Sequence, residues 1–372
     1  MKKILVVFGT RPEAIKMCPL VKELKKQNTF CTVVCVTGQH KQMLEQVLEV
    51  FDVCPEYDLD IMKERQTLYD ITENVLRGMQ NVLRKEEPDL VLVHGDTTTA
   101  FATSLAAFYE KIKVGHIEAG LRTYDLSAPY PEEFNRQCVG IIAEYHFAPT
   151  EKAEDNLLKE GKKRDKVYVT GNTVIDALKT TVRGNYSHPI LEWADGSRLI
   201  MLTAHRRENL GEPLRNIFIG IKKVLDEIED VKIIYPIHNN PVIREVAKDI
   251  FGNHERIKII EPLDVLDFHN FMNKSYLVLT DSGGIQEEAP ALGKPVLVLR
   301  DVTERQEGIY AGTLKLVGTD SQVITRELTR ILTDKEYYDS MSRVVNPYGD
   351  GTACEKIVRI LKNILYREIG WQ

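Results

Sequence analysis

Residues Val278–Pro290 read VLTDSGGIQEEAP, and this stretch predicts the fold around it. An apolar strand at Tyr276–Leu279 is followed by a sharp turn at Ser282–Gly284 and then by a helix. Such a turn leaves backbone N–H groups at the positive end of the helix dipole, where Ser282 can cap the helix or bind an anion. Simple helix capping is the alternative interpretation. The polar residues Gln286–Glu288, within one turn of the glycines, favour a site for a phosphate or diphosphate.

The rest of the chain repeats this strand–helix pattern. Strands without polar alternation, such as Lys3–Phe8 and Leu90–Val93, are separated by helices, which predicts parallel sheets covered on both faces. The regularity is lost between about residues 172 and 196 and resumes with a strand at 198–203. We therefore expect an α/β protein with two doubly wound, Rossmann-like domains, residues 1–172 and 173–352, facing a shared cleft.

The composition limits the partners. The 372 residues are enough for two cores, and 43% of them are hydrophobic. A net charge of -6 without a basic block argues against nucleic acid or an anionic membrane surface as a partner. No apolar run is long enough to cross a bilayer, and the apolar start is too short for a signal peptide. The six cysteines form no C-x-x-C pair, so we expect reduced thiols and a cytoplasmic location.

Charged and polar residues gather directly after the expected strands. Because ligands bind beyond the carboxyl ends of parallel strands, repeated polar clusters there predict a binding site rather than a series of helix caps. The clusters are Arg11 and Lys16, Gln39 and His40, Asp96, Glu118 and Arg122, Glu132 and Glu133, and His205, Arg206, Arg207 and Glu208.

No cofactor motif accompanies these residues. The first loop, FGTRPE, is not G-x-G-x-x-G, so we expect no tightly bound nicotinamide cofactor, and the P-loop motif is absent as well. Arg11, Lys16 and Arg305, together with the turn at Ser282–Gly284, are suited to a substrate that carries a diphosphate.

Histidines and carboxylates invite two interpretations. His94 and Asp96, like His116 and Glu118, are two residues apart and could form a metal cluster, but this spacing is not diagnostic. We expect instead no metal, and histidines that pack against and orient the carboxylates. Asp96, Glu118 and Glu132 are candidates for general acid and base, because carboxylates that meet in a cleft have divergent pKa values.

Two further residues are interpreted by their neighbours. His205 could simply bond local backbone at a strand end, but the arginines that follow it favour a phosphate or sugar contact. Glu133 is expected to be solvated or to be a charge at a helix start.

Several longer motifs occur in order: GTRPEAIK at 9–16, TGQH at 37–40, HGDTTT at 94–99, GHIEAGLR at 115–122, PEEFNR at 131–136, TGNTVID at 170–176, TAHRREN at 203–209, DSGGIQEE at 281–288 and GKPVLVLRDVTER at 293–305. With them the chain resembles the non-hydrolysing UDP-N-acetylglucosamine 2-epimerases of bacteria and archaea over essentially its whole length. Two residues depart from that pattern: Gln306 stands where proline is usual, and Leu263 where a uridine-contacting glutamine is frequent.

The resemblance implies a glycosyltransferase-B-like homodimer whose C-terminal helix, about 353–372, packs back on the first domain. It implies interconversion of UDP-GlcNAc and UDP-ManNAc with no cofactor. By position, the catalytic group is Asp96, Glu118, Glu132 and His205, and the UDP-sugar is bound by Arg11, Lys16, Phe268, Ser282, Gly283, Gly284, Glu288 and Arg305. In some bacterial members UDP-GlcNAc also binds a regulatory, allosteric site, whose positions match Gln39, His40, Gln42, Arg65, Arg206 and His238, with Glu132 shared.

These residue types suit an elimination. The C2 hydrogen of an N-acetylhexosamine is not acidic, but departure of UDP from C1 makes it removable and gives a 2-acetamidoglucal, to which UDP adds back after protonation from the opposite face. This route needs an acid, a base and a site for the leaving diphosphate. The alternatives are a hydrolysing epimerase that releases ManNAc and UDP, a retaining glycosyltransferase, and a non-catalytic UDP-sugar sensor. A sensor would gain nothing from three carboxylates.

Overall fold

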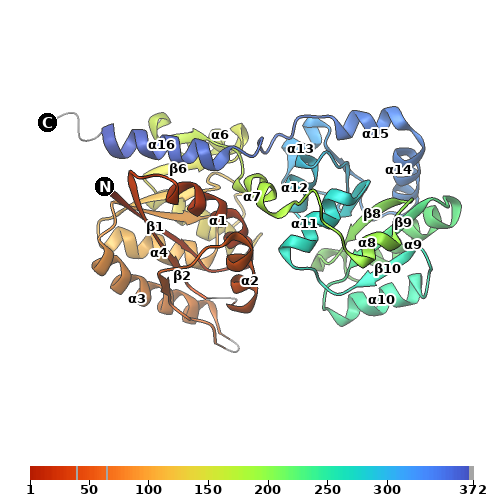
Figure 1. Ribbon diagram of the computed structural model, residues 1–372, viewed down its shortest axis with the longest axis horizontal. Coiled ribbons are helices and arrows are strands. Elements are labelled where there is room, and N and C mark those ends of the chain that lie inside the picture. Colours follow the sequence, from red (N-terminus) through yellow and green to blue (C-terminus); the bar gives the residue numbers. More distant parts are fainter. Residues whose placement is uncertain (39–40, 64–65, 368–372) are drawn as a thin grey trace. The chain divides into compact units, whose positions relative to one another are not determined.

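The computed structural model describes residues 1–38, 41–63 and 66–367, and the chain divides into two compact units. Unit 1 comprises Met1–Thr180 and Tyr348–Gln372, and unit 2 comprises Thr181–Pro347 (Figure 1). These boundaries lie several residues from 172/173 and 352/353, because Asp176 accepts backbone hydrogen bonds from Ala353 and Cys354 and so ties both segments to unit 1.

Unit 1 is built on a parallel sheet. Within the described residues the strand order is β3-β2-β1-β4-β5-β6-β7, so the progress of the chain reverses between β1 and β4. The strands are β1 (Lys2–Phe8), β2 (Phe30–Val36), β3 (Tyr57–Asp58), β4 (Leu90–His94), β5 (Lys113–Ile117), β6 (Tyr145–Ala148) and β7 (Val167–Val169). Neighbouring strands pair in parallel, and their carboxyl ends therefore share one edge of the sheet.

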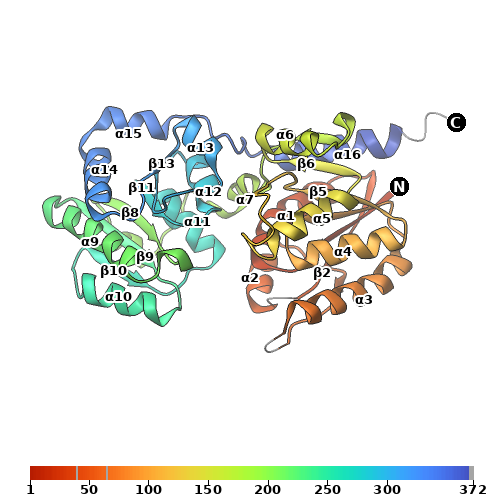
Figure 2. The ribbon, with the colours of Figure 1, turned by 180° about the vertical axis from the view of Figure 1, so that it is seen from behind.

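Helices cover both faces of this sheet. The face seen in Figure 1 is covered by α1 (Arg11–Lys25), α2 (Lys41–Phe51) and α16 (Ala353–Arg367). The opposite face, seen in Figure 2, is covered by α3 (Leu68–Glu86), α4 (Thr98–Tyr109) and α5 (Glu132–Ile142). The remaining helices of unit 1 are α6 (Glu151–Lys159), the 3-10 helix η1 (Arg164–Lys166) and α7 (Thr173–Thr181). The helix α16 packs against α1 and so belongs to unit 1, far along the chain from the rest of that unit.

Unit 2 repeats the architecture. Among the described residues its strand order is β10-β9-β8-β11-β12-β13, with the reversal between β8 and β11. The strands are β8 (Arg198–Thr203), β9 (Val231–Pro236), β10 (Ile257–Ile260), β11 (Leu277–Thr280), β12 (Val296–Val298) and β13 (Leu314–Leu316). The helices are α8 (Pro189–Trp193), η2 (Arg207–Asn209), α9 (Glu212–Glu227), α10 (Pro241–Phe251), α11 (Val265–Lys274), α12 (Ile285–Ala291), α13 (Gln306–Ala311), α14 (Ser321–Thr333) and α15 (Lys335–Ser342).

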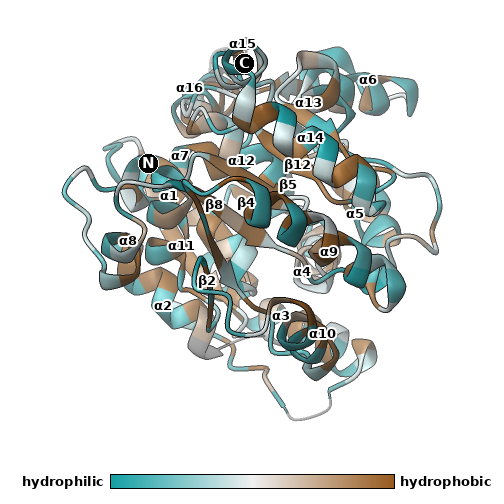
Figure 3. Cartoon of the chain, turned by 90° about the vertical axis from the view of Figure 1, so that its right-hand side faces the viewer, coloured by the Kyte–Doolittle hydropathy of each residue, from teal (hydrophilic) through white to brown (hydrophobic). Residues whose placement is uncertain are grey.

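The hydropathy of the elements explains their layers. Figure 3 shows hydrophobic segments along the strands, whereas a helix such as α14 carries both hydrophobic and hydrophilic residues. Ile324, Leu328 and Ile331 of α14 are buried and pack in one cluster with Phe218 of α9 and Tyr235 of β9. Strands buried on both faces and one-sided helices are what a doubly wound sheet requires, and the predicted α/β fold is confirmed.

Some elements differ from the sequence-based expectation. The stretch at 172–196, expected to be irregular, contains α7 and α8, and α5, β13, α14 and α15 were not anticipated. The strand β13 has three residues and α8 has five, which is too short for periodicity to be visible. All six cysteines are free. In the described part of the chain, no helix is both long and apolar enough to cross a membrane.

Candidate active site

The reversal between β1 and β4 brings the loops after these strands together. Gly9, directly after β1, lies against Thr37, which follows β2, and Thr99, in the first turn of α4, because a Cβ atom there would lie 2.0 Å from Thr37 Oγ1 and 2.6 Å from Thr99 Oγ1. The two hydroxyl groups are themselves hydrogen-bonded at 3.1 Å. Only glycine lets the loop pass over this pair, and the FGTRPE loop is thereby fixed at the carboxyl edge of the sheet.

Glu13 connects the same loops from the first turn of α1. Its Oε2 accepts hydrogen bonds from the backbone N–H groups of Gly9 (3.1 Å) and Thr10 (2.8 Å), which completes a capping box. Its Oε1 accepts a hydrogen bond from Thr97 Oγ1 at 2.7 Å. Burial raises the pKa of Glu13, although the hydrogen bond from Thr97 and the charge of His94 oppose this. The sequence analysis gave Glu13 no role.

Glu118, just beyond β5, contacts two basic side chains through one oxygen. Its Oε2 is bonded to Lys16 Nζ and lies 2.7 Å from His94 Nε2, although the second contact departs from the direction of a hydrogen bond. The Glu118 side chain is only 7% exposed. Burial by itself would raise the pKa of Glu118, but the charges of Lys16 and His94 outweigh it and hold the pKa well below its ordinary value. Glu118 is therefore an ionised, nearly buried carboxylate.

His116, by contrast, has a structural role. Its Nε2 lies 2.7 Å from the carbonyl oxygen of Gly95, and the side chain is fully buried. Burial lowers the pKa of His116 to about 3, so the ring is neutral. Strands β4 and β5 are neighbours, so His94 and His116 lie on adjacent strands. Among the described residues, no group of three His, Cys, Asp or Glu side chains is arranged to hold a metal ion.

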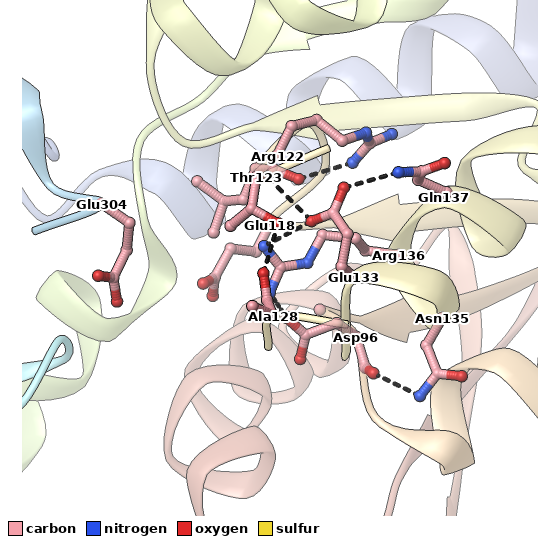
Figure 4. A network of polar contacts seen from close by, with 12 residues as sticks. Asp96, Glu118, Arg122, Thr123, Ala128, Glu133, Asn135, Arg136, Gln137 and Glu304 are labelled. Atoms are coloured by element: carbon pink, nitrogen blue, oxygen red, sulfur yellow. Dashed lines mark hydrogen bonds and ion pairs between the residues drawn. The ribbon is translucent and has the colours of Figure 1, made fainter. Parts of the chain in front are cut away.

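Asp96, in the loop after β4, is held by the first turns of α5. Arg136 Nη2 lies 2.6 Å from Asp96 Oδ2, and Asn135 donates its side-chain N–H to the Asp96 carbonyl oxygen at 2.9 Å. The second Arg136 nitrogen, Nη1, lies 3.4 Å from Glu133 Oε2. Figure 4 shows how Arg136 joins the two carboxylates. The PEEFNR motif thus positions Asp96 through residues that the sequence analysis did not single out.

Glu133 is a charge at a helix start, in the first turn of α5, as one of its two expected roles requires, but it is not solvated. The residue is fully buried, and its carboxylate accepts hydrogen bonds from the N–H groups of Thr123 and Tyr124 and from the Gln137 side chain. Burial would raise the pKa of Glu133, but these hydrogen bonds and Arg136 outweigh it and lower the pKa. Its neighbour Glu132, the first residue of α5, is half-buried.

Arg122 lies after β5, and its side chain forms a structural ion pair. Its Nε and Nη2 bind the Glu160 carboxylate at 2.6 and 2.9 Å, in a two-pronged ion pair that joins this loop to the end of α6. Arg11 is half-buried as the first residue of α1. Gln39, His40 and Arg65 lie outside the described residues, as does the side chain of Gln42.

In unit 2, Asp281 connects the two loops at the reversal between β8 and β11. The carboxylate is fully buried, and its Oδ2 accepts hydrogen bonds from the backbone N–H groups of His205 and Arg206, both at 2.8 Å, and from Asn209 Nδ2 at 3.1 Å. Its Oδ1 faces His205 Nδ1 at 3.7 Å. The aspartate of the DSGG motif therefore fixes the TAHRREN loop. The sequence pattern points only to the residues after Asp281, Ser282–Gly284.

His205 lies in the TAHRREN loop with an open face. Its ring stacks on that of His238, with centroids 5.5 Å apart and planes inclined by 13°. The side chain is 39% exposed. Burial of the remainder lowers the pKa of His205, while the Asp281 charge opposes the shift. At neutral pH the exposed imidazole can accept a proton or donate a hydrogen bond.

The DSGG turn differs from the capping interpretation. The N-cap of α12 is Gly284 and makes no side-chain cap bond, so Ser282 does not cap the helix. Gly283 lies close to Arg305, because a Cβ atom there would lie 3.2 Å from Arg305 Cζ. Arg305 in turn donates to Glu287 Oε1 (2.8 Å) and Glu304 Oε1 (2.7 Å). The turn and Arg305 are thus brought together, as the diphosphate hypothesis requires.

The other predicted residues of unit 2 lie on α11 and α12. Phe268 is half-buried on α11, and the next residue, His269, contacts Glu288 Oε2 at 3.2 Å. Arg206 is half-buried and His238 is exposed. Gln306 begins α13 and donates its side-chain N–H to the Thr303 carbonyl oxygen at 2.5 Å, which closes the turn that carries Arg305.

Two doubly wound units, with acidic and basic side chains at the carboxyl edges of their sheets, define a protein of the glycosyltransferase-B-like class. A family model described as UDP-N-acetylglucosamine 2-epimerase matches residues 22–362. A Bacillus subtilis UDP-N-acetylglucosamine 2-epimerase is 60% identical over 359 residues, covering 96% of this chain and 94% of its own. The chain belongs to the UDP-N-acetylglucosamine 2-epimerase family, and the resemblance seen in its motifs is confirmed.

Solved structures agree with this assignment. A crystal structure of the Neisseria meningitidis UDP-GlcNAc 2-epimerase bound to UDP-GlcNAc is 50% identical, with a TM-score of 0.88, and covers 96% of this chain and 99% of that one. The Methanocaldococcus jannaschii enzyme in complex with UDP-GlcNAc and UDP is 37% identical, with a TM-score of 0.80, and covers 97% of this chain and 99% of that one.

Proposed function

We propose that this chain interconverts UDP-GlcNAc and UDP-ManNAc by epimerisation at C2, without net hydrolysis. UDP leaves C1 as the C2 proton is removed, a 2-acetamidoglucal forms, and UDP adds back after C2 is protonated from the other face. The observation that carries this proposal is the nearly buried Glu118 carboxylate, which lies against Lys16 and His94 at the carboxyl edge of the sheet. Relatives that bind UDP-GlcNAc and UDP support the choice of substrate.

We assign the chemistry to residues of both units. Asp96, Glu118 and Glu132 supply acid and base, and His205 contacts the sugar or phosphate and completes the catalytic group. The leaving diphosphate needs cations and backbone N–H groups that remain in place while the C1–O bond breaks. Those groups and the rest of the UDP-sugar site are Arg11, Lys16, Phe268, Ser282, Gly283, Gly284, Glu288 and Arg305.

The test is to follow UDP-GlcNAc by NMR in D₂O. We expect UDP-ManNAc to appear, deuterium to enter C2 of both epimers, and no free UDP to accumulate. Free ManNAc with stoichiometric UDP would show a hydrolysing epimerase instead. Sugar transfer that needs an added acceptor would show a retaining glycosyltransferase. Binding without exchange at C2 would reduce the protein to a sensor.

The role of the DSGG turn has a separate test. Under the proposal the turn holds UDP between departure and return, so weakening it should release the intermediate. The double change Ser282→Ala with Gly284→Ala is expected to raise free UDP and 2-acetamidoglucal relative to epimer. The backbone of Gly284, with φ -62°, accepts alanine without strain. A fall in turnover without such leakage would mean that the turn only binds substrate.

We also propose a homodimer formed through unit 1. The helices α3, α4 and α5 expose large apolar side chains: Tyr69 is 89% exposed, Tyr109 64% and Ile141 76%. A hollow of about 200 Å³ next to them is lined by Leu76, Ala106 and Tyr109 among others. Exposed apolar patches of this kind mark interfaces. Sedimentation of wild type and Ile141→Lys should distinguish dimer from monomer.

Two further parts of the proposal rest on the family. UDP-GlcNAc is proposed to bind as an allosteric activator near Arg206 and His238, and the nucleotide-sugar substrate places the activity in the cytoplasm. Activation is tested by the reverse reaction. Conversion of UDP-ManNAc should show a lag that a trace of UDP-GlcNAc removes, and His238→Ala should keep the lag at concentrations of UDP-GlcNAc that remove it in wild type.

A further inference from the structure

Lys16 is bonded to Glu118 and is also assigned to the substrate. The proposed function assigns it to the substrate diphosphate, yet its ammonium group is bonded to Glu118 Oε2. Both side chains are largely withdrawn from water, with 14% of Lys16 and 7% of Glu118 exposed. A diphosphate beside Lys16 would draw the ammonium towards itself and would add negative charge near Glu118. Both effects favour proton binding by Glu118 and by the other side chain that contacts it, His94.

His94 is the side chain that remains. It is the last residue of β4, and only 6% of its side chain is exposed. Its Nε2 lies 2.7 Å from the Glu118 oxygen that Lys16 also contacts, but off the direction of a hydrogen bond. Among the described residues this buried nitrogen has no hydrogen-bond partner. A buried polar nitrogen is costly to leave unpaired, so the site is arranged to complete this bond once Lys16 moves.

The other titratable groups around the pair are already fixed. From α1, the charge of Glu13 acts on His94, but its carboxylate already accepts hydrogen bonds from Gly9, Thr10 and Thr97. From β5, His116 is held neutral by burial and by the Gly95 carbonyl oxygen. Lys16 is thus the neighbour whose position a bound anion can change.

We propose that diphosphate binding moves Lys16 from Glu118 to the substrate, and that His94 and Glu118 then close a hydrogen bond and take up one proton from solvent. His94 is thereby a positioning residue for Glu118. This inference rests on the proposed function, because it needs the diphosphate at Lys16. The direction of proton exchange follows from charge. Moving a cation away and adding an anion raises the proton affinity of the pair, so UDP binding is accompanied by proton uptake and not by release.

The measurement is titration calorimetry of the full chain with UDP, in Hepes and in Tris at about pH 8, where the terminal phosphate of UDP, with a pKa near 6, is ionised. The two buffers release different heats when they give up a proton. We expect the difference to show proton uptake on UDP binding. Glu118→Gln and His94→Gln should still bind UDP but with reduced uptake, because each leaves one titratable group without its partner. His254→Gln, in unit 2, is the matched control and should keep the wild-type uptake.

Three results would overturn the inference. UDP binding without proton uptake in wild type would show that the pair does not titrate, and unchanged uptake in Glu118→Gln would place the proton elsewhere. Failure of wild type to bind UDP would overturn the proposed function and this inference with it. Steady-state rates give a second readout that needs only wild type and His94→Gln. We expect about 10-fold lower kcat, a shifted pH profile and little change in KM; a profile that keeps its wild-type shape would remove His94 from this role.

Discussion

Replacing Asp281 should loosen unit 2 from within its binding edge. Its Oδ2 accepts hydrogen bonds from the His205 and Arg206 backbones and from Asn209, and the carboxylate is fully buried. Asp281→Ala removes the acceptor of two backbone N–H groups and of one Asn209 N–H, at about 1–3 kcal/mol each, so we expect a loss of about 3–9 kcal/mol in the free energy of unfolding. Asp281→Asn keeps an acceptor but loses the charge, and should cost about 1–2 kcal/mol.

The assay is urea unfolding followed by tryptophan fluorescence in a Trp371→Phe background. The chain has two tryptophans, and Trp193, in α8, then reports on unit 2 alone. Asp249→Asn is the control, because Asp249 pairs with Arg215 and is 58% exposed; it should change the free energy by less than about 0.5 kcal/mol. An Asp281→Ala protein as stable as that control would refute the idea that this carboxylate holds the two loops together.

Three more changes test unit 1. Gly120→Ala should cost about 2–4 kcal/mol in thermal or urea unfolding, because φ is 92° and the new Cβ would lie 2.2 Å from a backbone oxygen, whereas Gly161→Ala, at φ 81° in open space, should cost about 1 kcal/mol. His116 is neutral when folded, with its pKa lowered from 6.5 to about 3, so the unfolded state binds more protons in this window. Stability should therefore fall from about pH 6.5 to pH 3, by up to about 4 kcal/mol, and His116→Gln should flatten the fall measured by urea titration. Arg136→Gln frees Asp96 and should lower kcat about 10-fold or more with little effect on KM.

The carboxyl edges of the sheets could be predicted from sequence because strand ends are visible there. Strands such as β1 and β4 are unbroken apolar runs, and the residues that follow them must lie at one edge once the sheet is parallel. The reversal between β8 and β11 then brings His205 and the DSGG turn together. The alternation of strands and helices along the chain does not give the order of the strands in the sheet. It does predict a parallel sheet, which is enough to place both loops at the same edge of unit 2.

Partners within that edge could not be predicted. Glu132 and Glu133 are adjacent, and successive helical residues point about 100° apart, so only the docking of α5 decides which one is buried. Lys16 and Glu118 are 102 residues apart in sequence, and no local pattern links them. The role of Asp281 could not be predicted because its partners, the backbone N–H groups of His205 and Arg206, carry no sequence signal.

Glu13 and Glu118 show why charge governs the chemistry of this edge. Both carboxylates are buried beside His94, yet the pKa of Glu13 is raised and that of Glu118 is lowered. The hydrogen bonds to Glu13 come from neutral donors, whereas Glu118 is bonded to the ammonium of Lys16. Burial pushes both pKa values upwards, and the charge of Lys16, together with that of His94, is what lowers the pKa of Glu118. Any anion that competes for Lys16 therefore controls the proton on Glu118, and under the proposed mechanism that anion is the diphosphate that leaves and returns. Inversion at C2 still needs a second acid or base on the opposite face of the sugar, so Glu118 can supply only one of the two proton transfers.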